Sequence, residues 1–150
     1  MRKTFTVEGN PSPFQRTGKG FYTQGRHKQW AKQVAVEVMM QNRGQKQADP
    51  KAPFVLVVTT HPGTRKDGKP KVVRGDVDNY AKLVADCLQG VLYENDKQAW
   101  AIVGAEGAPW SNEHGGQSVD IVWPKNRAAV SDALQAFLTA IDPGGYCHES

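Results

Sequence analysis

The sequence predicts one α/β (α+β) domain in which helices pack against a mixed, mainly antiparallel sheet. Short segments with alternating or continuous apolar, β-branched side chains indicate strands. Longer segments with apolar residues every three or four positions indicate amphipathic helices. Both kinds of segment occur within a chain of 150 residues, which is long enough for one domain with its own hydrophobic core.

The composition is that of an ordinary globular protein and excludes several other classes. Hydrophobic residues make up 39% of the chain and charged residues 23%, as in globular domains generally. No apolar run is long enough to span a membrane, and the N-terminal segment lacks the apolar centre of a signal peptide. The two cysteines, Cys87 and Cys147, form no CxxC pair and indicate a reducing compartment. We therefore expect no membrane partner and a cytoplasmic location.

The first half of the chain is predicted to contain a helix between strands. The strands are at residues 3–8, at 21–23 as a short candidate, and at 53–60, and the helix is at residues 26–42. The first strand alternates, which turns Phe5 and Val7 inward, whereas the strand at 53–60 is continuously apolar, as in the centre of a sheet. In the helix, Trp30, Val34 and Val38 recur every four residues and predict a buried face; Gly44 ends it.

The second half is predicted to contain two more helices and an antiparallel hairpin. The helices are at residues 77–91 and about 126–141, the hairpin joins strands at 98–103 and 118–123, and a mobile tail follows at 142–150. At about 100° per residue, the helix at 77–91 has one apolar face and a second face with Asp78, Lys82 and Asp86. The whole chain, 1–150, is expected to be one domain with a core at about 3–123.

Basic residues are concentrated just before the helix at 77–91. The net charge is +4 and the pI is near 9.1, which weakly suggests a polyanionic partner. The segment at residues 61–74 contains one acid, Asp67, and five basic residues: Arg65, Lys66, Lys69, Lys71 and Arg74. Such a run is either a solvated loop or an arm that contacts phosphates, and the acids that follow favour the arm. The same two interpretations apply to Arg16 and Lys19 in the loop at 14–20.

The acids at the start of that helix have two interpretations. Acids are common at a helix start, because they cap its free N–H groups and favour its dipole, and this accounts for one or two of them. Alternatively, Asp76, Asp78 and Asp96 hold a hard cation such as Mg²⁺, which prefers oxygen ligands. Lys82, one turn beyond Asp78, then stabilises charge on a phosphate, and Asp86 supports Lys82. Together with the basic segment, these residues favour a metal-dependent phosphodiesterase over a set of surface ion pairs and turn residues.

The motifs in this region resemble the signature of the RusA family of Holliday junction resolvases. The family pattern is Asp-x-Asp-Asn, a lysine four residues after the second Asp, then Asp-x-Leu, and an acidic turn before a strand. This chain has Asp76-Val77-Asp78-Asn79-Tyr80-Ala81-Lys82, Asp86-Cys87-Leu88 and Tyr93-Glu94-Asn95-Asp96-Lys97-Gln98. The resemblance covers roughly residues 3–123 and leaves the C-terminal helix as an extension.

The resemblance implies a homodimeric crossover junction endodeoxyribonuclease of phage or bacterial origin, active in recombination and repair. Such an enzyme uses Mg²⁺, with Mn²⁺ as an alternative, to hydrolyse phosphodiesters in opposed strands of a four-way DNA junction. It implies that Asp76, Asp78 and Asp96 bind the metal and that Lys82 is essential, while Asn95 in place of an acid leaves open whether Glu94 joins Asp96. The expected DNA contacts are Arg16, Lys19, Arg65, Lys66, Lys69, Lys71 and Arg74. Two alternatives remain, a branched-DNA-binding protein that does not cut and a metal-dependent nuclease for other branched or RNA substrates.

Overall fold

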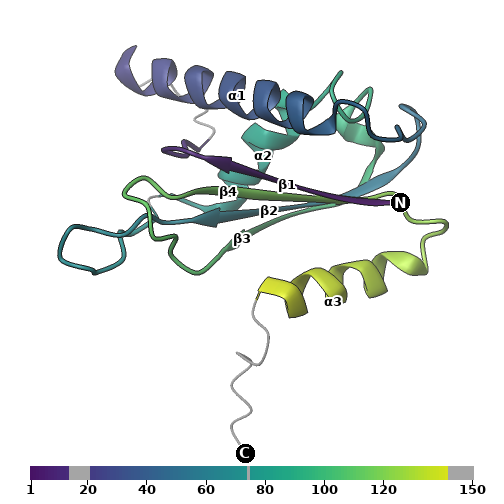
Figure 1. Ribbon diagram of the computed structural model, residues 1–150. Helices are drawn as coiled ribbons and strands as arrows, with labels where there is room; N and C mark the ends of the chain where they lie inside the picture. Colours follow the sequence, from purple (N-terminus) through teal and green to yellow (C-terminus); the bar gives the residue numbers. More distant parts are fainter. Residues whose placement is uncertain (14–20, 74, 142–150) are drawn as a thin grey trace, which may run out of the picture.

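A computed structural model describes residues 1–13, 21–73 and 75–141 and shows a four-stranded sheet with helices on both faces (Figure 1). The strands are β1 (Arg2–Glu8), β2 (Phe54–His61), β3 (Ala99–Glu106) and β4 (Gly116–Val122). The helices are α1 (Phe21–Asn42), α2 (Val77–Cys87), the 3-10 helix η1 (Asp96–Gln98) and α3 (Ala129–Ile141). None of the helices in the described ranges is long and apolar enough to cross a membrane.

The sheet is mixed and mainly antiparallel, which confirms the predicted fold class. The strand order is β1-β4-β2-β3, with β4 antiparallel to both β1 and β2, and β3 parallel to β2. The predicted hairpin between the strands at 98–103 and 118–123 is therefore wrong. Their connection passes the end of β2, where Gly107 and Trp110 donate backbone hydrogen bonds to Thr60 and Pro62. This detour lets β4 enter between β1 and β2, so that the central strand β2 has a partner on each side.

Both faces of the sheet are covered, and this explains the continuous apolar sequence of β2. Helices α1 and α2 lie on one face and α3 lies on the other (Figure 1). Successive side chains of a strand point to opposite faces, so Leu56 and Val58 pack in the core beneath α1 and α2, whereas Val55 and Val57 pack with Phe137 of α3. All of these side chains are buried.

Two other predicted elements differ from the structure. Residues 21–23, a candidate strand, are the first turn of α1, because β propensity is weak beside the contacts of a long helix packed on the sheet. The predicted helix at 77–91 ends at Cys87. Beyond it, Gly90 has a φ of 81° and donates a hydrogen bond to the carbonyl of Tyr93 at 2.7 Å, which closes a turn instead of extending the helix.

Candidate active site

Helix α2 lies directly on the sheet, and a glycine in β3 makes this close packing possible. A Cβ atom at Gly104 would lie 2.3 Å from the carbonyl oxygen of Val77, at the first residue of α2. The apolar face of α2 is buried at Tyr80, Ala81, Leu83, Val84 and Ala85. The opposite face exposes Asp78, Lys82 and Asp86 to solvent, as the periodicity predicts.

Asp76 occupies the N-cap position of α2, yet its carboxylate does not cap the helix. The backbone is extended (φ −78°, ψ 135°), and the side chain makes no capping hydrogen bond. The carbonyl oxygen of Asp76 accepts the N–H of Asn79 at 3.0 Å, so the helix start is formed by backbone groups. Gly75 precedes it with a φ of 91°, a conformation that favours glycine. The exposed carboxylates of Asp76 and Asp78 are thus available to a ligand.

Lys82 stands between two acids on the exposed face of α2 without binding either of them. In the described part of the chain, the structure contains the ion pairs Arg2–Asp120 and Arg65–Asp67, and Lys82 takes part in neither. The interpretation of Lys82 as half of a surface ion pair with Asp78 or Asp86 therefore has no support in the structure. Its side chain is exposed to solvent.

The third predicted carboxylate, Asp96, contacts Asp86. The turn before it is fixed by Asn95, whose side chain accepts the N–H of Lys97 at 2.9 Å, and by Gln89, whose side chain accepts the N–H of Asp96 at 3.1 Å. Partial desolvation raises the pKa of Asp86, and a hydrogen bond to the Asp96 carboxylate and repulsion from it raise this pKa further. The sequence analysis placed Asp86 beside Lys82 and missed the Asp86–Asp96 pair. The feature of the sequence that could have indicated this pair is Gly90, because a turn there brings the chain back toward α2.

The acids thus form two groups at opposite ends of α2. Asp76 and Asp78 lie at its N-terminal end, and Asp86 and Asp96 lie at its C-terminal end. At a rise of about 1.5 Å per residue, Asp78 and Asp86 are separated by about 12 Å along the helix axis. Among the residues that the structure describes, no three His, Cys, Asp or Glu side chains lie close enough together to hold a metal ion. One chain therefore does not bring Asp76, Asp78 and Asp96 to one point.

In the described part of the chain, His61 and Cys87 are held in contacts that leave neither side chain as an alternative reactive group. His61 stacks on Trp110 at 4.6 Å, and its ring nitrogens lie 2.9 Å from the carbonyl oxygen of Ala108 and from the hydroxyl of Ser118. Both nitrogens are engaged in joining β2 to its neighbours. Burial, then the nearby charge of Asp86, raises the pKa of the Cys87 thiol to about 12, so this cysteine is a poor nucleophile.

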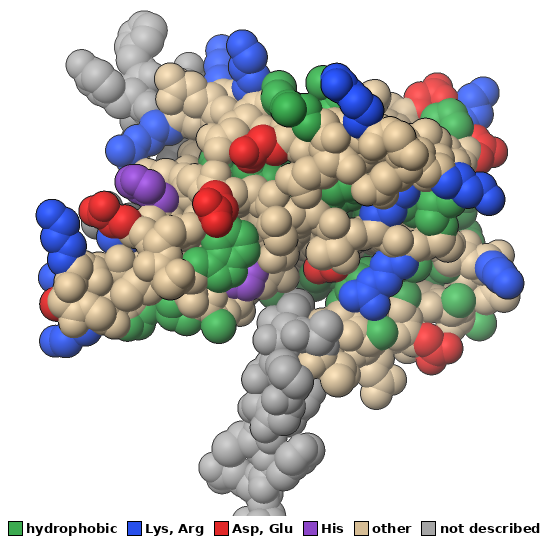
Figure 2. All heavy atoms as spheres, viewed as in Figure 1, with side chains coloured by type: hydrophobic (Ala, Val, Ile, Leu, Met, Phe, Trp, Pro, Cys, Tyr) green, Lys and Arg blue, Asp and Glu red, His purple; other side chains and the backbone are tan. Residues whose placement is uncertain are grey.

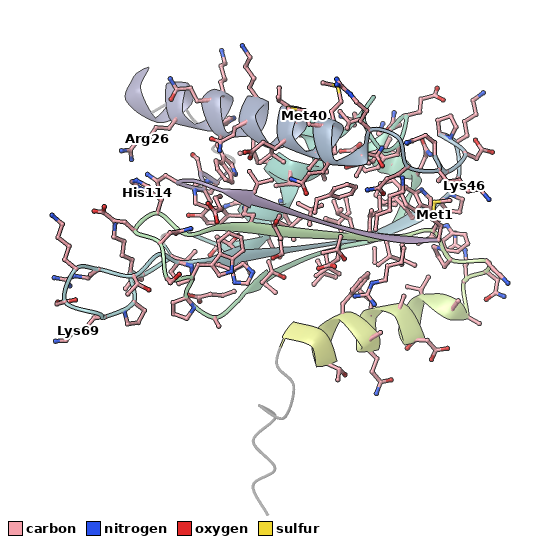
Figure 3. The ribbon with its side chains drawn as sticks, viewed as in Figure 1. Met1, Arg26, Met40, Lys46, Lys69 and His114 are labelled. Carbon is pink, nitrogen blue, oxygen red and sulfur yellow. The ribbon has the colours of Figure 1, made fainter. Side chains whose placement is uncertain are left out.

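The predicted phosphate-binding arm is an ordered hairpin, here called the basic loop (residues 62–73). Thr64 pairs with Pro70, and Arg65 donates its N–H to the carbonyl of Lys69 at 2.8 Å. The loop protrudes from the end of β2 with Lys69 at its tip (Figure 3), and Lys and Arg side chains gather around it (Figure 2). A cavity of about 370 Å³ is lined by Arg65, Lys66, Asp67, Lys71 and Glu113. The other predicted DNA contacts, Arg16, Lys19 and Arg74, lie outside the described residues.

A comparison with known protein families identifies the family. The model of the family described as endodeoxyribonuclease RusA matches residues 5–121. The chain belongs to the RusA family. Membership supports an endonuclease of the Holliday junction resolving class that binds branched DNA in recombination, in a family of phages and bacteria. The predicted resemblance is confirmed, and helix α3 lies beyond the matched residues. No curated protein sequence matches the chain.

Proposed function

We propose that this RusA family protein is a homodimeric, Mg²⁺-dependent Holliday junction resolvase. It would hydrolyse phosphodiesters near the branch point in two opposed strands, in the bacterial cytoplasm where bacterial or phage DNA is found. One observation carries the proposal. The exposed face of α2 begins at Asp76, whose carboxylate does not cap the helix. It continues through Asp78 and Lys82 and ends at the Asp86–Asp96 pair.

The donor set fits a hard divalent cation. Mg²⁺ is usually held by one or two carboxylates together with waters and substrate phosphates. Partial desolvation and the neighbouring Asp96 raise the pKa of Asp86, so two acids lie close together here; a divalent cation bound between them would remove their repulsion. Bound Mg²⁺ or Mn²⁺ would polarise the scissile phosphate and lower the pKa of the attacking water. At this end of α2, both Asp96 and Asp86 would bind the cation.

A symmetric dimer would complete the site from two copies. In one chain, the two acid groups are separated by the length of α2. A two-fold axis beside Lys82, with two antiparallel α2 helices, would place Asp76 and Asp78 of one copy opposite Asp86 and Asp96 of the other. Two-fold assemblies are the commonest oligomers, and two equivalent sites suit a four-way junction in which two opposed strands must be cut.

The positive groups would act on the DNA rather than on the metal. The Lys82 ammonium would stabilise negative charge that develops on the phosphate during displacement. The basic loop, which emerges from the end of β2 beside the start of α2, would hold the backbone of one junction arm through Arg65, Lys66, Lys69 and Lys71. Such contacts release counterions, so binding is expected to weaken steeply with salt.

A cleavage assay tests the proposal. The protein is incubated separately with a mobile four-way junction, a linear duplex, a flap and an RNA hairpin. Each substrate is tested once in Mg²⁺ and once in EDTA. We expect paired nicks in opposed strands of the junction, only with the metal. Tight junction binding without any metal-dependent product would instead identify a non-cleaving junction protein, and preferential cutting of the flap or the RNA would identify a nuclease with another substrate.

A further inference from the structure

A second basic cavity lies at the other end of α2, on residues outside the predicted DNA-binding set. Its volume is about 410 Å³, and its lining includes Lys51, Lys97, Trp100 and Arg127. Among the described residues, none of those that line this cavity is acidic. Lys97 directly follows Asp96 in the chain, so this cavity borders the C-terminal acid group, as the basic loop borders the N-terminal one.

Hydrogen bonds hold the two lysine-bearing segments together. The side-chain amide of Gln98 donates to the carbonyl oxygens of Pro50 and Ala52, at 2.8 and 3.1 Å. Its oxygen accepts the N–H of Asn95 at 2.8 Å. The segment before β2 is thereby fixed against the turn that contains η1. Lys51 and Lys97 thereby line the same cavity, and both are exposed.

The third cation, Arg127, is held by an aromatic ring. Its guanidinium carbon lies 5.0 Å from the ring centroid of Trp100, and this half-buried ring packs with the cluster beneath α3. A guanidinium over an aromatic face still has N–H groups in its plane for an anion. In the described part of the chain, Arg127 forms no ion pair, so its charge is uncompensated by the protein.

We propose that Lys51, Lys97 and Arg127 bind the backbone phosphates of a second arm of the DNA junction, with Trp100 positioning Arg127. The occupant is a DNA backbone, because three cations without an acid, on an open surface next to Asp96, match a row of phosphates. The inference rests on the proposed function, since it adds a second arm contact to the same substrate. Arg127 lies beyond the residues that the family model matches, so this contact depends on the C-terminal extension of this chain.

A charge-matched pair of variants tests the inference. Lys51→Ala/Lys97→Ala/Arg127→Ala removes the three cations, and Lys28→Ala/Lys32→Ala/Arg43→Ala removes two lysines and an arginine that are exposed on or just after α1. Affinity for a fixed four-way junction is measured without Mg²⁺ over a range of salt, and thermal melting confirms that each variant is folded. Each lost phosphate contact reduces the slope of log K against log salt by about 0.9.

We expect the cavity variant to bind the junction about tenfold more weakly near 0.1 M salt, with its salt slope reduced by about 2 to 3. The control variant should keep nearly the wild-type slope. Equal slopes for the two variants would overturn the inference and leave the proposed function intact. Failure of the wild-type protein to bind or cut a junction would instead overturn the proposed function.

The role of Trp100 is tested by its dependence on Arg127. Trp100→Leu should weaken junction binding in the wild-type background and have little further effect once Arg127→Ala is present, because the ring acts through the guanidinium. A double-mutant cycle on junction affinity measures this coupling. Additive losses from the two substitutions would show that Trp100 does not position Arg127.

Discussion

Each end of α2 has two acids with basic residues nearby, but the two ends draw these residues from different numbers of chain segments. At the N-terminal end, Asp76 and Asp78 follow directly after the basic loop, so acids and cations come from one continuous segment. At the C-terminal end, Asp86 meets Asp96 through a turn, and the neighbouring cations come from three separate segments. The first group is a product of local sequence, whereas the second exists only in the folded chain.

The two groups also differ electrostatically. The N-terminus of a helix carries partial positive charge and favours acids, whereas the C-terminus carries partial negative charge and disfavours them. Asp76 and Asp78 therefore stand where carboxylates are stabilised. Asp86 stands near the unfavourable end, and partial desolvation together with the carboxylate of Asp96 raises its pKa. A bound cation should therefore stabilise the C-terminal pair more than the N-terminal one. The two ends should differ in their response to substitution, to the mixing of inactive variants, to Mg²⁺ and to pH.

The largest expected effect is on cleavage. Asp78→Asn and Asp96→Asn should each reduce single-turnover cleavage of a four-way junction by about a thousandfold, since each removes a carboxylate of the proposed metal site that activates the attacking water. Junction affinity should be nearly unchanged, because the basic residues remain. Asp132→Asn, an exposed acid on α3, is the matched control. If only one of the two site variants lost activity, one end of α2 would be dispensable.

Mixing the two inactive variants shows whether the ends act within one chain or between two. A mixed dimer of Asp78→Asn and Asp96→Asn copies has one intact site if each site takes one end of α2 from each copy. With random assortment, about a quarter of the wild-type sites should recover, seen as nicks in a single strand of the junction. If both ends of one chain formed each site, the mixture would stay as inactive as its components.

Local features of this site could be predicted from the sequence, and contacts between distant segments could not. The spacing of α2 residues separates its apolar face from the face with Asp78, Lys82 and Asp86, because helix geometry alone decides it. The Asp86–Asp96 pair depends on where α2 stops, and Gly90 decides this through a turn. The pairing of β3 with β2 was missed for a related reason: strands close in sequence favour a hairpin, but β4 pairs with one edge of β2 and β3 pairs with the other.

Metal binding should be visible in stability as well as in activity. If Mg²⁺ binds the Asp86–Asp96 pair, a free concentration about ten times its dissociation constant stabilises the fold by about 1.4 kcal/mol. For a chain of this size that corresponds to a rise in Tm of about 3–5 °C. Asp96→Asn should lose most of this rise, and Asp132→Asn should keep it. An equal rise in both variants, measured by thermal melting without DNA, would place the cation elsewhere.

The smallest expected effect is the pH dependence of stability at the C-terminal end of α2. Folding raises the pKa of Asp86 above its usual value of 3.8, so the folded state binds more protons in this window and wild-type stability falls as the pH rises through the raised pKa. Asp86→Asn removes this penalty. In EDTA it should be more stable than the wild type at pH 7, by less than about 1 kcal/mol because Asp86 is exposed to solvent. The difference should shrink as the pH falls toward 4, and urea unfolding at both pH values measures it. A variant less stable than the wild type at pH 7 would show that the pair stabilises the fold without a cation, which would contradict the electrostatic difference between the two ends.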